Sequence, residues 1–254
     1  MGSDGRGNGE ERMAAPITDE LKAKLRQVST ATLTTQLFKR GLRNTFMTGL
    51  KPLAGGGAVM VGEAYTLRYI PSREDIDVLE ILSRSDHPQR RAIEETPPGH
   101  VLVMDARGDI RGATGGGILM TRLAVRGVAG RVTDSGLRDV AEIAQLPMPI
   151  YIRQPVASLN LVVHHAVDTN VPIACAGVPV YPGDVIVGDA DGVVCVPRHL
   201  AAEVAEEGFE MERKERFVTL KIKAGAPLFG TYPPDAKTSE EYKAWIARGA
   251  PDKL

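Results

Sequence analysis

A glycine-rich segment and a later run of charged residues occur within one short stretch of the chain. Residues 114–117 read TGGG, Arg138-Asp139 follows Gly117 after twenty intervening residues, and Glu142 follows Asp139 after two more. The guanidinium of arginine offers a planar fork of donors that suits a carboxylate, and carboxylates are hard oxygen ligands for divalent cations. These residue types predict a site for a small anionic substrate beside a divalent cation.

The surrounding elements must bring these residues together. Apolar residues at helical spacing follow the glycines, so the glycines lie at the start of a helix whose first amides lack partners and attract anions. A short β-prone run, residues 128–133, ends just before the turn DSG and the Arg-Asp pair. Since ligand groups in α/β proteins collect where strands end and helices begin, both parts can face one cavity. The predicted substrate-binding residues of the loop are Gly115, Gly116, Gly117, Ile118 and Leu119.

Each part of this pattern also has an interpretation without function. Glycine is the default residue of turns, so the triplet alone could be an ordinary loop. Arg138-Asp139 could form a surface ion pair near the start of a helix, and Glu142 could be solvated. Only the ordered combination favours a site.

The combined spacing of Gly117, Arg138, Asp139 and Glu142 resembles that of the RraA-like family. This family includes the class II 4-hydroxy-4-methyl-2-oxoglutarate and 4-carboxy-4-hydroxy-2-oxoadipate aldolases and the regulator of RNase E activity. The likeness covers about residues 17–230, and the segments outside the motif that share it are 28–33, 50–53, 61–68, 178–180, 182–184 and 189–194.

The resemblance implies an α/β fold, a swivelling β/β/α domain with a central mixed sheet flanked by helices. It also implies homotrimers or homohexamers with sites between subunits. By the same resemblance, Arg138 of this chain would contact pyruvate or its enolate, and Asp139 would bind Mg²⁺ or Mn²⁺ partly through waters. The loop amides from Gly116 to Leu119 would hold the carboxylate.

Two features qualify the resemblance. The aldolases have an aspartate where this chain has Gly117, and Glu142 could compensate by reaching the metal or its waters. A glutamate from a neighbouring subunit approaches the site in the family, and Glu212 and Glu215 are candidates for it. Their segment reads equally well as a charged amphipathic helix.

The implied activity is retro-aldol cleavage of a 4-hydroxy-2-oxo acid to pyruvate and a second carbonyl product, by a metal-dependent lyase whose catalytic residues are Arg138, Asp139 and Glu142. Oxaloacetate decarboxylation needs the same enolate, so we expect it as a side activity. The alternatives are a lyase, hydratase, dehydratase or hydrolase acting on another 2-oxo or 2,4-dioxo acid, and a non-catalytic, protein-binding regulator of the RNase E type.

Composition narrows the class of protein. The formal net charge of -1 gives no sign of nucleic-acid binding, and the apolar runs are far shorter than a membrane span. Residues 1–13 are glycine-rich and charged without the apolar core of a signal peptide, so we expect a cytoplasmic protein. The predicted organisation is a disordered lead over 1–16, a catalytic domain over 17–224 and a C-terminal extension over 225–254.

The remaining motifs favour structural roles. Cys175 and Cys195 lie in apolar surroundings and are expected to be buried free thiols. His164-His165 is expected at a polar strand edge rather than in a metal site. Periodicity predicts helices over about 18–41, 75–83 and 197–223, strands over 58–61, 64–70 and 101–105, and short strands from 150 to 196.

Overall fold

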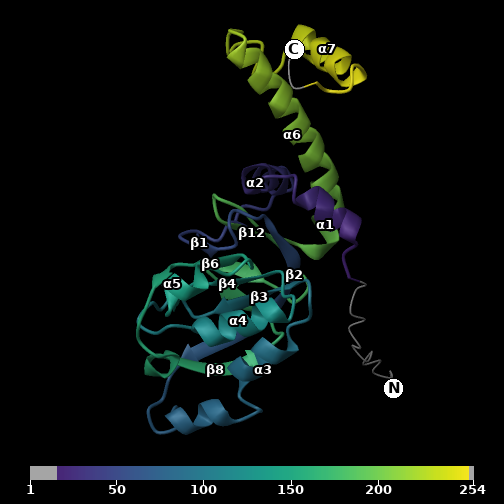
Figure 1. Cartoon of the computed structure of the whole chain (residues 1–254). Coiled ribbons are helices and arrows are strands. Elements are labelled where there is room, and N and C mark those ends of the chain that lie inside the picture. The colour runs from purple at the N-terminus through teal and green to yellow at the C-terminus, as the bar shows by residue number, and fades with distance from the viewer. Residues whose placement is uncertain (1–15, 252–254) are drawn as a thin grey trace, which may run out of the picture.

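The fold is organised around one mixed β-sheet (Figure 1). The computed structural model describes residues 16–251, and the sheet has the strand order β1-β6-β4-β3-β2-β11-β12, with β8 also paired to β2. Strands β2, β3, β4 and β6 run parallel to one another, while the remaining pairings in the sheet are antiparallel. The strands of this sheet are β1 Lys51–Ala54, β2 Met60–Pro71, β3 His100–Asp105, β4 Gly130–Thr133, β6 Ile150–Ile152, β8 His164–Thr169, β11 Val185–Gly188 and β12 Val193–Val196.

Two short strand pairs and seven α-helices complete the described part of the chain. The pairs are β5 Gly136–Leu137 with β7 Gln154–Pro155, and β9 Ile173–Cys175 with β10 Val178–Val180. The helices are α1 Asp19–Leu25, α2 Thr30–Lys39, α3 Pro88–Glu95, α4 Gly117–Val125, α5 Val140–Ile143, α6 Ala201–Lys223 and α7 Ala236–Ala247. Figure 1 shows α6 leading away from the sheet and carrying α7 at its far end. The predicted fold class, α/β with a central mixed sheet flanked by helices, is confirmed.

The central strands are apolar on both sides because both faces of the sheet are covered. Along β3, Leu102 and Met104 pack under α3, α4 and α5, whereas Val101 and Val103 point to the opposite face and pack towards β9 and β10. This alternation is the period of a strand, and burial on both faces explains the continuous apolar run. A third cluster joins α1, α2 and α6 to β11 and β12.

Four of the predicted elements differ from the structure. The helix expected over 18–41 is two helices, because the Ser29 hydroxyl accepts the Thr32 N–H at 3.1 Å and caps a new helix. The strands expected at 58–61 and 64–70 are the single strand β2. Within 75–83 only a 3-10 helix forms, from Leu79 to Ser83.

The C-terminal part contains a packed helix. Trp245 of α7 is fully buried, and its ring centroid lies 5.5 Å from that of Phe217 on α6. Trp245 therefore packs within the chain. Tyr232, in the segment between α6 and α7, is half-exposed. The expected lead over 1–16 lies almost wholly outside the described residues, and the boundaries at 17, 224 and 225 stay predictions.

The structure shows the burial and the contacts of the two cysteines and the paired histidines. Cys175 and Cys195 are buried free thiols, as predicted, and burial raises the pKa of each. The expectation for His164 is wrong: it is fully buried rather than at a polar edge, with Nε2 3.0 Å from the Gly112 carbonyl oxygen. His165 lies with Nδ1 2.7 Å from Asp77 Oδ1.

Between residues 16 and 251, no helix combines the length and apolar character needed to cross a bilayer.

Candidate functional site

Backbone pairing brings the glycine loop beside the Arg-Asp segment. Thr114 N donates to the Gly136 carbonyl oxygen at 2.9 Å, and Arg138 N donates to the Gly115 carbonyl oxygen at 3.2 Å. These bonds continue the parallel bridge between Ala113 and Gly136. Two segments that are separated in sequence by all of α4 and β4 therefore lie side by side.

The glycines leave space for neighbouring side chains and do not adopt an unusual backbone angle at Gly116. Gly116 is the N-cap of α4 and has φ -143°, a value open to any residue. A Cβ on Gly116 would lie 2.5 Å from Asp139 Oδ2, and a Cβ on Gly117 would lie 2.7 Å from Glu142 Oε2. The two carboxylates occupy the room that side chains at these positions would take.

Asp139 connects the two segments. Its Oδ2 accepts the Gly117 N–H at 3.0 Å and lies 3.6 Å from Arg138 Nε. Because the Gly117 amide is already used in this way, the first-turn amides of Ile118 and Leu119 remain for a substrate carboxylate. This arrangement differs from the expectation that all the loop amides hold substrate.

The backbone of Asp139 has an uncommon conformation. With φ 60° and ψ 34° it is left-handed, which aspartate and asparagine tolerate better than most residues do. Helix α5 begins at the next residue, so Asp139 precedes the helix that carries Glu142. Glu142 N donates to the Asp139 carbonyl oxygen at 3.2 Å, which brings both side chains to the same side, against the glycines.

A cavity of about 210 Å³ opens beside the loop. Six of the eight predicted residues line it, while Gly117 and Glu142 lie outside its lining. The predicted residues that line it are Gly115, Gly116, Ile118, Leu119, Arg138 and Asp139. The side chains of Arg138 and Asp139 are about half-exposed, at 47% and 46%, so the cavity has access to solvent.

Three polar residues of the cavity were not identified from the sequence. Gln89 and Arg90 come from α3, and Asn160 comes from the turn before β8. Asn160 is only 5% exposed, and its Nδ2 has no hydrogen-bond partner among residues 16–251. The sequence shows the pair Arg90-Arg91 as a charged segment, but the neighbouring residues do not indicate which of the two arginines lines the cavity.

Buried polar groups support the loop from behind. The Asp134 carboxylate accepts the amides of Ala106 and Gly108 at 2.7 and 2.8 Å, and burial raises the pKa of Asp134. The Ser135 hydroxyl donates to the Gly112 carbonyl oxygen at 3.0 Å. Burial also lowers the pKa of His164, so the neutral ring is favoured beside Gly112. These residues stabilise the approach to the glycine loop.

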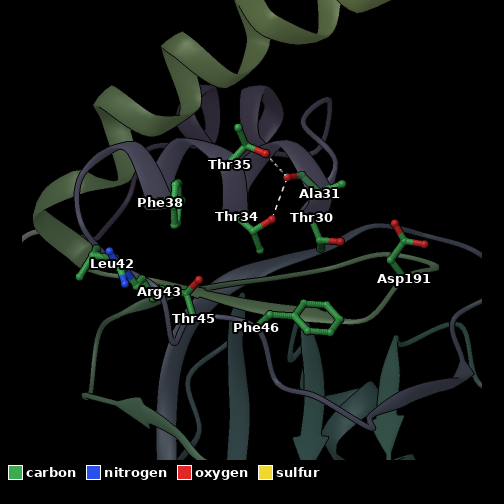
Figure 2. Close-up of a pocket in the computed structure, with 10 residues that line it drawn as sticks. All are labelled: Thr30, Ala31, Thr34, Thr35, Phe38, Leu42, Arg43, Thr45, Phe46 and Asp191. Atoms are coloured by element: carbon green, nitrogen blue, oxygen red, sulfur yellow. Dashed lines mark hydrogen bonds between the residues drawn. The ribbon is translucent and has the colours of Figure 1, made fainter.

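A larger hollow, of about 580 Å³, lies elsewhere, beneath α2 (Figure 2). The hydroxyls of Thr34 and Thr35 in its wall donate to the Ala31 carbonyl oxygen, at 2.8 and 3.1 Å. Asp191 is the single carboxylate among its lining residues. This hollow has neither a glycine loop nor paired carboxylates, so we place the candidate site at the smaller cavity.

The glutamates proposed for a neighbouring subunit lie on α6. Glu212 Oε1 accepts the Ser29 N–H at 2.9 Å, which gives it a structural role at the start of α2. Burial, followed by the nearby charge of Glu212, raises the pKa of Glu215. Neither glutamate lines the cavity of its own chain.

The donor set at the site suits a hard divalent cation that keeps several waters. Asp139 and Glu142 supply carboxylate oxygens, and Mg²⁺ is commonly held by one or two carboxylates together with water and substrate oxygens. Over residues 16–251 no group of three His, Cys, Asp or Glu side chains could hold a metal ion. The residues present therefore fit Mg²⁺ or Mn²⁺ better than a structural zinc ion, which needs four protein ligands.

Comparison with known proteins gives the same family from sequence and from structure. The family model "RraA-like: Aldolase/RraA" matches residues 27–195. A relative from Halalkalibacterium halodurans, provisionally named as a 4-hydroxy-4-methyl-2-oxoglutarate aldolase, is 34% identical over 188 residues, which are 72% of this chain and 82% of the relative.

Two solved structures share the fold. Streptomyces coelicolor RraAS2, described as an unusual member of the RNase ES inhibitor RraA protein family, has a TM-score of 0.69 and 31% identity, over 81% of this chain and 98% of that one. A protein of Pseudomonas syringae has a TM-score of 0.76 and 24% identity, over 87% of this chain and 96% of the other.

Proposed function

This chain belongs to the RraA-like family, and we propose that it is a divalent-metal-dependent lyase that cleaves a 4-hydroxy-2-oxo acid to pyruvate and a second carbonyl product. The observation that carries the proposal is the joint lining of one cavity by Arg138, Asp139 and the glycine loop. The aldolase name of the relative with 34% identity supports the reaction class.

In this proposal the chain's residues divide the work. Arg138 binds the 2-oxo acid, and the amides of Ile118 and Leu119 bind its carboxylate. Asp139 and Glu142 would hold Mg²⁺ or Mn²⁺ through carboxylate oxygens and intervening waters. When bound, the ion would withdraw electrons as the bond between C3 and C4 breaks.

Glu142 has the role that an aspartate at position 117 has in the aldolases that the sequence resembles. Its carboxylate lies against Gly117, where that aspartate would begin. From this position Glu142 orients a water, and that water takes the proton of the 4-hydroxyl group. We further propose that oxaloacetate is decarboxylated at the same site, because the product is the same enolate.

A neighbouring subunit completes the site in a homotrimer or homohexamer. Ile118, at the start of α4, is 86% exposed beside the cavity, so the site lacks a cover within one chain. Glu215 is the candidate for the neighbour's carboxylate, since the Glu212 side chain is engaged with Ser29.

A screen of 2-oxo acids tests the function. With Mg²⁺ or Mn²⁺ present, pyruvate release is measured with lactate dehydrogenase from 4-hydroxy-4-methyl-2-oxoglutarate, related 4-hydroxy-2-oxo acids and oxaloacetate. We expect EDTA to abolish turnover and added Mg²⁺ or Mn²⁺ to restore it. Full turnover in the chelator would contradict the metal-dependent mechanism, and no pyruvate from any 2-oxo acid would contradict the lyase.

Glu142→Gln tests the compensation for Gly117. We expect kcat to fall by about a hundredfold, within the usual range for loss of a group that transfers a proton. Stability should change by less than about 0.5 kcal/mol because Glu142 is exposed. Steady-state kinetics and thermal unfolding measure the two effects.

The matched control restores a carboxylate at the neighbouring position. In Gly117→Asp/Glu142→Gln the new side chain meets only the far end of residue 142, which can move, so we expect a partial return of kcat. Wild-type kinetics in Glu142→Gln would remove Glu142 from the reaction and leave the aldolase assignment intact.

A second candidate function is regulation of an endoribonuclease by protein binding. It is favoured by the similarity to Streptomyces coelicolor RraAS2, whose family is described as RNase ES inhibitors. Titration of an RNase E-type enzyme with the purified chain would detect inhibition. Inhibition without pyruvate release from any 2-oxo acid would favour the regulator over the lyase.

A further inference from the structure

Arg131 is a fully buried arginine in the centre of the sheet. It lies on β4 and is 0% exposed, among the largest side chains that the fold buries. It is paired with Leu102 of β3, and its guanidinium nitrogen Nη2 lies 3.0 Å from Met104 Sδ. Arginine is almost never buried without a partner, so this position needs an explanation.

The charge of Arg131 is not balanced within the described chain. Among residues 16–251, the charged or titratable groups that act on it are Tyr69 and Cys175, neither of them an Asp or Glu, and its Nε and Nη1 atoms have no hydrogen-bond partner there. Burial lowers the pKa of Arg131 to about 10, so the group stays charged at neutral pH. The nearby phenol of Tyr69 supplies no negative charge, because burial raises its pKa to about 12.

The guanidinium lies directly behind the glycine loop. Its nitrogen Nη2 donates to Thr114 Oγ1, and Thr114 precedes Gly115. The Thr114 hydroxyl in turn lies 3.1 Å from the Gly136 carbonyl oxygen, which places it to donate there, and Gln89 Nε2 donates to the Thr114 carbonyl oxygen at 3.1 Å. A buried cation therefore contacts the residue that precedes the glycines, three positions before α4 begins.

We propose that Arg131 is a positioning residue for an anion at the glycine loop: it fixes the loop through Thr114, and its unbalanced charge attracts the carboxylate bound there. The identity of that carboxylate as a 2-oxo acid rests on the proposed function. The proposal accounts for a charge that would otherwise only cost stability, because burying an unpaired ion is unfavourable.

The proposal gives opposite expectations for stability and for binding. Arg131→Met keeps an unbranched side chain and removes the charge, so the unfolding midpoint should stay the same or rise. The same substitution should raise the Kd of oxalate and pyruvate by about tenfold, because the Coulomb attraction between the buried cation and the bound carboxylate is lost. A purely structural arginine would show the reverse, lower stability with unchanged binding.

Arg131→Lys provides a second readout. Lysine keeps the charge, but its pKa falls readily on burial. Tyr69 and Cys175 are the titratable groups beside it, and both stay neutral because burial raises their pKa values. We expect this variant to bind oxalate almost as well as wild type near pH 6 and to lose affinity as the pH rises, while wild-type affinity changes less.

The experiment uses the full chain with Mg²⁺ and measures oxalate, pyruvate and inorganic phosphate binding by calorimetry, beside thermal unfolding and steady-state kinetics. Arg122→Met is the matched control, since it removes one arginine from the exposed side of α4, where Arg122 pairs with Glu94 at 2.8 Å. For Arg131→Met we expect a larger rise in KM than fall in kcat, and for Arg122→Met no change.

The outcomes separate this inference from the proposed function. Unchanged anion affinity in Arg131→Met and in Arg131→Lys across pH would overturn the role of Arg131, even if wild type releases pyruvate. Anion binding that depends on Arg131 without pyruvate release from any 2-oxo acid would support the anion role and contradict the lyase. A wild-type chain that binds none of the three anions would overturn both.

Discussion

Asp139→Asn is expected to remove most of the affinity for Mg²⁺ or Mn²⁺ and to lower kcat/KM by at least about a hundredfold, because a neutral amide replaces a charged ligand at the reacting centre. Asparagine is the cleanest replacement here. Its side-chain oxygen can still accept the Gly117 N–H, which Asp139 Oδ2 accepts at 3.0 Å. It also tolerates the left-handed backbone, with φ 60°.

The measurement is Mn²⁺ binding, followed by electron paramagnetic resonance, beside pyruvate release. Asp139→Ala is the comparison, because alanine loses the ligand, the hydrogen bond to the Gly117 N–H and tolerance of the backbone angle together. We expect Asp139→Asn to unfold near the wild-type temperature and Asp139→Ala to unfold earlier. An unchanged Mn²⁺ dissociation constant in Asp139→Asn would show that the metal ligand has been misassigned.

Arg138→Lys is expected to lower kcat/KM by on the order of a hundredfold, which corresponds to about 3 kcal/mol of lost transition-state stabilisation. Lysine keeps the charge but replaces the planar fork with a single ammonium group, so it cannot bind a carboxylate and an enolate oxygen in the same way. Since the Arg138 side chain is 47% exposed, the substitution should leave the fold intact.

Steady-state kinetics on the best substrate from the 2-oxo acid screen measure this effect. Arg111→Lys is the control, because Arg111 is an exposed arginine that pairs with Asp109 and does not line the cavity. A loss of less than a few-fold in Arg138→Lys, similar to that in the control, would place Arg138 outside the site.

The site residues break local rules of folding in ways that their neighbours compensate. Asp139 has a left-handed backbone, Gly116 and Gly117 leave room that two carboxylates fill, and Arg131 is a buried charge without an acidic partner. The missing acidic partner of Arg131 refers to residues 16–251. Such departures tend to gather at functional sites, where stability is given up for a defined arrangement of charge. Their concentration around one loop supports the choice of this cavity over the larger hollow beneath α2.

The features that depend on local order could be predicted from the sequence. The spacing from Gly117 to Arg138, Asp139 and Glu142 identified the loop and its charged partners, and helical periodicity after the glycines predicted α4, which begins at Gly117. Apolar surroundings predicted that Cys175 and Cys195 are buried. Local sequence is sufficient for these features because capping, periodicity and burial act over a few residues.

The groups that share the cavity could be identified only from the contacts between distant segments of the folded chain. The pairing of Thr114 with Gly136 places Arg138 against the loop, and the same packing brings Arg90 and Asn160 to it. Nothing near Arg131 in the sequence shows that its strand is buried on both faces, or that its head group lies behind Thr114. These facts depend on contacts between segments far apart in the chain, and the register of neighbouring strands fixes such contacts, not the order of residues within one strand.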